Sequence, residues 1–320
     1  MSVASAMTSL PTVAIAAATA LFLWWFSTGV LFWLARRLSN PRAVIAGAGL
    51  VLAGSLWLIA ACAGQATETA AYLSFLGGIG AWSFAEITFL TGTLTGPVRD
   101  RCPAGLAGAR RFMRALGTLL WHELAILAIA LAVVAITWGA VNQVGTWAFM
   151  LLMTMRISAK LNLFLGVPYP PSTLLPSSIA HLDSYFRRGP FTALLPAVVT
   201  AATSLATMIA WHAAAPGLDV FTAASYALLW TLLVLGIVEH WFLILPVREG
   251  ALWAWFSGMP ARPATPSAPR ASGALSGRVK GSPIPSDRGK PSYVTVASGE
   301  ERAFARPQTT TRNDHEVKAA

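Results

Sequence analysis

The fold is decided by residues 124–155, which read LAILAIALAVVAITWGAVNQVGTWAFMLLMTM and contain no charged side chain. A helix needs about twenty residues to cross a membrane core of about 30 Å, so this stretch is too long for one crossing. The polar pair Asn142-Gln143 lies inside it, with Gly139 and Gly145 close on either side. The stretch therefore predicts two transmembrane helices that meet at a tight turn.

The same criterion, applied outward from this turn, finds apolar stretches of sufficient length along most of the chain. The predicted spans are residues 10–35, 43–65, 72–95, 118–140, 145–165, 191–213 and 220–245. Hydrophobic residues make up 55% of the chain and charged residues only 11%, against roughly a half and a quarter in soluble domains. We predict an all-α polytopic membrane helix bundle with about seven transmembrane helices, formed by residues 1–258.

Basic residues occupy alternate connections between these spans. The first, third and fifth connections and the segment after the last span hold Arg36, Arg37, Arg42, Arg99, Arg101, Arg110, Arg111, Arg114, Arg187, Arg188 and Arg248. The second and sixth connections carry only Glu68 and Asp219, and the fourth has no charge. Short basic loops stay in the cytoplasm, so we expect the N-terminus outside and the C-terminus inside. This topology and attraction to anionic membrane lipids explain the pI of about 10.4, and no nucleic-acid partner is expected.

Residues 259–320 differ in composition from the rest of the chain. They are rich in Pro, Ser, Ala and Gly, carry charges of both signs and contain few large apolar residues. Such a segment cannot bury enough apolar surface to offset the entropy of ordering it. We predict a disordered cytoplasmic tail.

Small residues four positions apart occur within the spans and permit close helix contacts. The pairs are Gly49/Ala53, Ser74/Gly78 and Gly77/Ala81. Because such pairs also occur by chance in spans rich in alanine, they allow close contacts of the second and third spans without requiring them.

Ionisable side chains inside the spans are the best chemical clue, because charges in a membrane interior usually face the bundle and mark functional sites. Together with the neighbouring amide of Asn162, they form a predicted intramembrane polar cluster of Glu86, His122, Glu123, Arg156, Lys160, Asn162, Glu239 and His240. The alternating direction of the spans places all of them in the cytoplasmic half. We expect the third, fourth, fifth and seventh spans to meet there, with Glu86 or Glu239 accepting hydrogen bonds from Arg156 or Lys160.

Several interpretations of the cluster remain open. Ion pairing between its acids and bases is a structural role, and Arg156 and Lys160 can also extend to the inner interface. A single imidazole can ligate the magnesium of a chlorin, which makes His122 and His240 candidate pigment ligands. Adjacent residues point about 100° apart on a helix, and the Glu-x-x-His spacing of di-iron bundles is missing, so no metal site is predicted. No nucleotide-binding, HExxH or CxxC motif occurs, and we expect the protein not to be an enzyme.

Five segments resemble one known family. They are LWWFSTG at 23–29, LLWHEL at 119–124, NQVGTW at 142–147, MRISAKLNLFLGVP at 155–168 and EHWF at 239–242. Over residues 15–256 the chain resembles the photosynthetic complex assembly protein 2 family (PuhE type) of purple phototrophic bacteria. The tail lies outside the resemblance.

The resemblance implies a multi-pass protein of the bacterial inner membrane, with a periplasmic N-terminus and a cytoplasmic C-terminus. Its implied role is to assist assembly of the photosynthetic reaction centre and light-harvesting complex, with subunits of these complexes as partners, and to modulate bacteriochlorophyll supply. One alternative is a membrane protein that itself binds bacteriochlorophyll or a metal. Another is a proton-coupled transporter, although the broken helices and repeats typical of transporters are not visible.

Overall fold

The structure, a computed structural model, describes residues 3–172 and 175–246 of the chain. Seven helices in this part are long and apolar enough to cross a membrane. They are α1 (Val3–Arg37), α2 (Pro41–Cys62), α3 (Glu68–Leu90), α4 (Gly108–Ile136), α5 (Val144–Leu165), α6 (Leu194–Ala213) and α7 (Val220–Phe242). The described residues contain no β-strand, so the predicted all-α polytopic membrane bundle is confirmed. The predicted tail, and the domain boundary at 258, lie outside the described residues.

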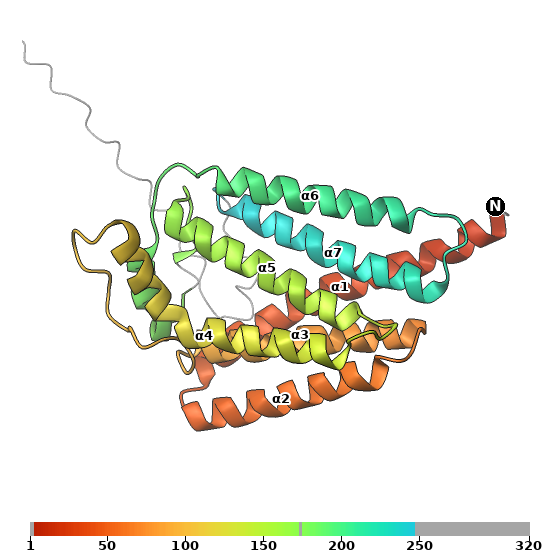
Figure 1. Cartoon of the computed structure of the whole chain (residues 1–320), viewed down its shortest axis with the longest axis horizontal. Helices are drawn as coiled ribbons and strands as arrows, with labels where there is room; N and C mark the ends of the chain where they lie inside the picture. The colour runs from red at the N-terminus through yellow and green to blue at the C-terminus, as the bar shows by residue number, and fades with distance from the viewer. Residues whose placement is uncertain (1–2, 173–174, 247–320) are drawn as a thin grey trace, which may run out of the picture. The chain divides into compact units, whose positions relative to one another are not determined.

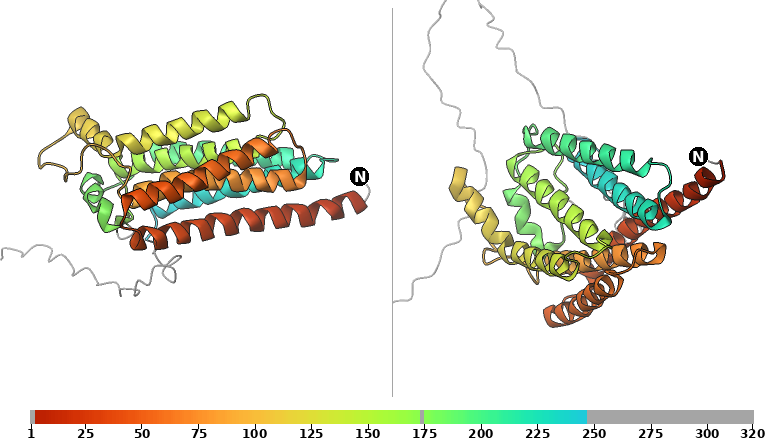
Figure 2. Two further views of the ribbon diagram at one scale, coloured as in Figure 1. Left: turned by 90° about the horizontal axis from the view of Figure 1, so that it is seen from below. Right: turned by 45° about the vertical axis from the view of Figure 1, so that its right-hand side comes forward.

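Helix α3 is the central element of the bundle. It packs against α1, α2, α5 and α7. Of its most apolar stretch of 18 residues, 72% is buried, far more than in any other span. Helix α1 lies beside α7, whereas α2 and α6 lie at opposite outer edges (Figures 1 and 2). Glu86, which lies on α3, is therefore buried within the bundle.

Glycine brings α3 and its neighbours into close contact. A Cβ atom placed on Gly78 would lie 2.5 Å from the carbonyl oxygen of Gly145 on α5, and one on Gly77 would lie 3.0 Å from the carbonyl oxygen of Ser55 on α2. The small-residue pairs of the third span thus lie at helix contacts. Gly49, of the Gly49/Ala53 pair, does not lie at a close helix contact, because a Cβ atom placed on it would meet no atom within 4 Å.

The turn between α4 and α5 is built around Asn142, which is fully buried. Its amide Nδ2 donates to the carbonyl of Ala70, and its Oδ1 accepts from the backbone N–H of Val144. Its own backbone N–H donates to the carbonyl of Ala63. One polar residue therefore ties this turn to the turn between α2 and α3.

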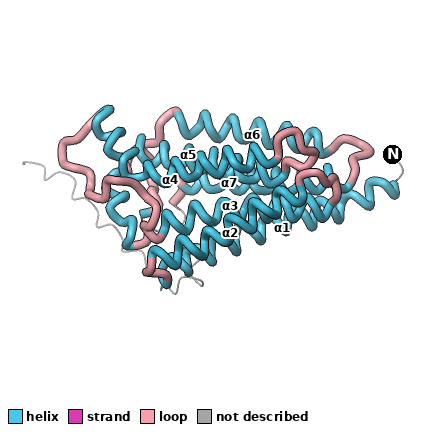
Figure 3. The backbone as a smooth tube through the Cα atoms, turned by 60° about the horizontal axis from the view of Figure 1, so that its bottom comes forward, coloured by secondary structure: helices cyan, strands magenta, loops and turns pink. Residues whose placement is uncertain are grey.

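The arginine-rich connections lie at the end of the bundle away from the N-terminus, where Figure 3 shows long loops. We call it the basic end. Two predicted helix boundaries were wrong there. Helix α3 ends at Leu90 rather than at 95. Gly92, two residues after this end, has a left-handed φ of 71°. Helix α4 begins at Gly108 rather than at 118, so part of the predicted arginine-rich loop is helical. Arg111 stabilises this extension, because its guanidinium donates to the carbonyls of Phe164 and Tyr185.

The connection between α5 and α6 contains the 3-10 helix η2 (Ser177–Tyr185). Its side chains Ile179 and Leu182 pack with Phe89 and Leu90 of α3 in one apolar cluster. The connection is thereby fastened to the basic end of the bundle.

Candidate functional site

Helix α5 joins the polar cluster together, because three of its side chains bind side chains of other helices. Arg156, Ser158, Lys160 and Asn162 lie in its second half. Through these side chains it contacts polar groups of α3, α4 and α7. The spans expected to meet at the cluster therefore do meet there.

The first ion pair links α5 to α3. Arg156 Nη2 lies 3.1 Å from Glu86 Oε2, which is one of the pairings expected from the sequence. The Glu86 side chain is only 10% exposed, whereas that of Arg156 is 39% exposed. The second carboxylate oxygen, Glu86 Oε1, is buried and has no hydrogen-bond partner.

The second ion pair links α5 to α4, with Lys160 Nζ 2.7 Å from Glu123 Oε1. The same ammonium lies 5.8 Å from the centroid of the Phe89 ring, within the range of a cation–π interaction. Lys160 therefore does not simply extend to the interface, since carboxylate and aromatic groups hold it within the bundle.

His240 on α7 has both ring nitrogens occupied. Nδ1 lies 2.8 Å from the carbonyl oxygen of Gly236, which can only accept, so Nδ1 carries the proton. Nε2 then accepts a hydrogen bond from the Ser158 hydroxyl at 2.9 Å. This arrangement leaves no lone pair for a magnesium ion and makes His240 a helix-to-helix linker.

His122 on α4 is fully buried, and neither ring nitrogen has a hydrogen-bond partner. Its ring stacks on that of Phe89 with centroids 4.4 Å apart. Asn162 is also fully buried, but its Nδ2 donates to the carbonyl of Ser158 within its own helix. Asn162 therefore makes no hydrogen bond to the charged pairs.

Glu239 on α7 is bound to a residue that the sequence analysis did not assign to the cluster. The indole Nε1–H of Trp24 on α1 donates to Glu239 Oε1 at 3.1 Å. Trp24 belongs to an apolar run, and only the following pair Ser27-Thr28 indicates a polar helix face. The first span therefore joins the site, although it carries no charge at this depth.

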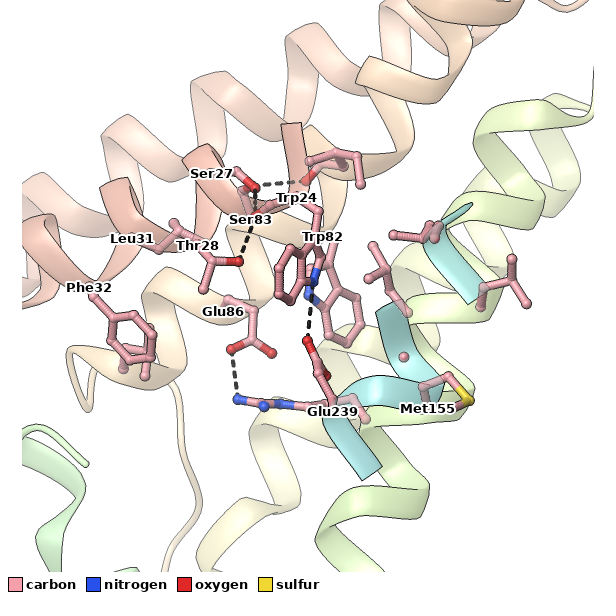
Figure 4. A pocket seen from close by; sticks show the side chains of 17 residues that line it. Trp24, Ser27, Thr28, Leu31, Phe32, Trp82, Ser83, Glu86, Met155 and Glu239 are labelled. Carbon is pink, nitrogen blue, oxygen red and sulfur yellow. Dashed lines mark hydrogen bonds and ion pairs between the residues drawn. The ribbon is translucent and has the colours of Figure 1, made fainter. Parts of the chain in front are cut away.

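Two cavities lie next to each other at the cluster, with Arg156 and Glu239 in the walls of both. The smaller, of about 100 Å³, lies between α1, α3, α5 and α7 (Figure 4). The larger, of about 220 Å³, lies at the basic end and is lined mainly by apolar side chains of α1, α4, α5 and η2. Drug-sized ligands occupy about 300–1,000 Å³, and a bacteriochlorin is larger still.

Neither cavity fits an enclosed bacteriochlorophyll. His122 lines neither of them, and the nitrogens of His240 are engaged as described. Among the residues that the structure describes, no three His, Cys, Asp or Glu side chains gather in a way that could hold a metal ion. What the site does show is a set of paired charges bordering two cavities.

The wall of the larger cavity includes η2, which carries a histidine outside the spans. Burial disfavours a charge on His181, and the nearby guanidinium of Arg99 adds repulsion, so the pKa of His181 lies below its ordinary value of 6.5. Its Nε2 is buried without a hydrogen-bond partner. The packing of η2 against the bundle therefore favours the neutral form of the His181 imidazole.

Fold and site together define a polytopic membrane protein whose bundle encloses paired charges. The chain belongs to the family described as "Protein of unknown function (DUF3623)", whose sequence profile matches residues 10–264. It is 37% identical over 245 residues to a Rhodobacter capsulatus protein described as "Uncharacterized 30.4 kDa protein in puhA 5'region", and the match covers 75% of this chain and 89% of that protein. No solved structure matches the chain.

Proposed function

We propose that this protein is an accessory factor of the photosynthetic membrane that assists assembly of the reaction centre and light-harvesting complex. The observation that carries the proposal is that its Rhodobacter capsulatus relative is described as lying in the puhA 5′ region. The family match includes all seven spans, so the relationship concerns the whole bundle. The finer role in assembly also draws on the resemblance of residues 155–168 to the PuhE-type family.

The membrane-facing surface supports a role through contacts with other membrane helices. Helix α2 exposes Trp57 and Leu50, and α6 exposes Trp211 and Met208. Helices associate in membranes by van der Waals packing and by lipid exclusion, and such surfaces are able to receive partner spans. Reaction-centre or light-harvesting subunits are the partners that we propose.

A non-enzymatic role is part of the proposal. Arg156 and Lys160 are bound to carboxylates, and His240 is bound to Ser158 and Gly236. These contacts support a structural use of the cluster. The bacterial inner membrane, with a periplasmic N-terminus and a cytoplasmic C-terminus, is the location that the charge pattern favours.

Co-purification tests the proposal. The full-length protein, tagged and expressed at native level in a phototrophic host, should be captured together with reaction-centre or light-harvesting polypeptides while these complexes are forming. A tagged, unrelated multi-pass protein of the same membrane is the control. Capture of no photosynthetic subunit beyond the control level would contradict the proposal.

The absorption spectrum of the same preparation separates assembly from pigment handling. Bacteriochlorophyll that purifies with the protein alone, in the absence of photosynthetic polypeptides, would favour a pigment-binding protein that modulates bacteriochlorophyll supply. Pigment present only together with those polypeptides is the result that we expect.

A further inference from the structure

The smaller cavity is lined by two carboxyl groups but only one guanidinium. Glu86 of α3 and Glu239 of α7 both line it, together with Arg156 of α5 (Figure 4). The ammonium of Lys160 does not contribute to the net charge of this lining, because it is bound to Glu123 and does not line the cavity. With both carboxyls ionised, the lining therefore carries one unbalanced negative charge.

An uncompensated charge within a membrane is costly, by about 2.5–3.5 kcal/mol on insertion scales, and such groups are normally paired. Glu86 Oε1 has no hydrogen-bond partner, although the Glu86 side chain is nine-tenths buried and lines the cavity. In Figure 4 the carboxyl groups of Glu86 and Glu239 lie in the same space. The missing partner is thus expected inside this cavity.

The hydroxyl groups of the lining also present oxygen lone pairs. Thr28 Oγ1 and Ser27 Oγ both donate to the carbonyl of Trp24, and Ser83 Oγ donates to the carbonyl of Ile79. Because each hydroxyl proton is used within its own helix, what these oxygens offer the cavity is acceptor capacity. An occupant that is positively charged and coordinated by oxygen matches this lining.

We propose that the cavity is a binding site for one alkali cation of the size of sodium. The ion is held by Glu239 and Glu86 Oε1, with hydroxyl oxygens of Thr28, Ser27 or Ser83 completing its surroundings. A single positive charge neutralises the lining. A volume of about 100 Å³ accommodates a small ion with a few waters. Hard cations prefer such oxygen ligands.

The test uses the purified full-length protein at mildly alkaline pH, with ionic strength held constant by N-methyl-D-glucamine chloride. Radioactive sodium should bind saturably at one ion per chain. Sodium chloride should also raise the unfolding temperature relative to N-methyl-D-glucamine chloride, because a ligand that binds only the folded state stabilises it.

The variant Glu239→Gln should lose both effects. Its amide oxygen can still accept from Trp24, and Arg156 keeps its partner Glu86, so the variant leaves no cation unpaired. Glu68→Gln, at the start of α3, is the matched control and should bind sodium like the wild type. If Glu239→Gln fails to fold, Thr28→Val is the second variant and should weaken sodium binding several-fold.

The absence of saturable sodium binding by the wild type would overturn the proposal, as would undiminished binding by Glu239→Gln. Neutralisation of Glu239 by a proton alone would give the first of these results. The experiment does not involve photosynthetic partners, so its outcome is independent of the proposed role in assembly.

Discussion

Glu86 and Arg156 form the contact at which the energetics of single residues can be tested most simply. They come from different helices, their side-chain atoms lie 3.1 Å apart, and the Glu86 side chain is only 10% exposed. Removal of one partner deprives the other of its direct counter-charge, whereas removal of both does not. The pair is therefore expected to matter more for folding than an exposed pair of the same kind.

The first prediction is that Glu86→Gln lowers the stability of the folded protein by about 1.5–3 kcal/mol, because Arg156 loses its charged hydrogen-bond partner and keeps only the carboxyl group of Glu239 in the wall of the same cavity. Protein abundance in membranes and thermal unfolding in detergent measure the effect. The double variant Glu86→Gln/Arg156→Met should recover part of the loss. Asp100→Asn is the control, since the Arg114–Asp100 pair is exposed and worth at most about 1 kcal/mol. Equal effects of Glu86→Gln and Asp100→Asn would refute the buried-pair interpretation.

His181 provides a second prediction, which concerns pH. The pKa of His181 is lowered in the folded protein, so below about pH 6.5 the unfolded segment binds more protons than the docked one. The stability contributed by a neutral His181 is thus present above this pH and is lost as the pH falls. As the pH is lowered from about 7.5 to about 5.5, the rate of amide hydrogen exchange in η2 should rise relative to the rate in α3. His181→Gln should remove this difference, and an unchanged pH response in that variant would assign it to other groups.

Single residues also mark the limit of what the sequence predicts about the site. The depth of each charge follows from span direction, which is why the convergence of Glu86, Glu123, Arg156 and Lys160 was predictable. Which carboxylate faces which cation depends on helix rotation, and periodicity in a span that is apolar on all sides does not define rotation. For the same reason Trp24 could not be identified as the partner of Glu239.

Among the elements, the contact between α3 and α5 depends most on side-chain size. Gly78→Ala should lower thermal stability by about 1–3 kcal/mol, because its Cβ would lie 2.5 Å from the Gly145 carbonyl and 3.1 Å from the Cβ of Ala148. Gly49→Ala on α2 is the matched control, where a Cβ meets no atom within 4 Å. Similar unfolding temperatures for the two variants would contradict the close packing of α3 against α5.

Element boundaries were predictable where polarity changes sharply and not elsewhere. The turn at Asn142-Gln143 was located because two polar residues interrupt an apolar run. The start of α4 was missed because Arg110, Arg111 and Arg114 resemble a loop by charge alone, and their helical state depends on distant partners such as Phe164 and Tyr185. Tertiary contact, rather than local composition, extends this helix.

For the whole molecule, the distribution of basic residues leads to a topology prediction. Arginines accumulate in the connections at the basic end, whereas the connections at the opposite end carry only Glu68 and Asp219. An alkaline phosphatase fusion at Asp219 should be active, and a fusion after Ala320 should be inactive. Cytoplasmic reporter fusions at the same two sites provide the complementary control. The reverse pattern of activities would contradict the proposed orientation.

Deletion of the gene in a phototrophic host that carries it tests the proposed role in assembly of the photosynthetic complex. The measurement is the near-infrared absorbance of assembled reaction-centre and light-harvesting complexes in membranes, normalised to total extractable bacteriochlorophyll. If the protein assists assembly, the ratio of assembled complex to pigment should fall, and a plasmid copy of the wild-type gene should restore it. An unchanged ratio in the deletion strain would contradict a role in assembly.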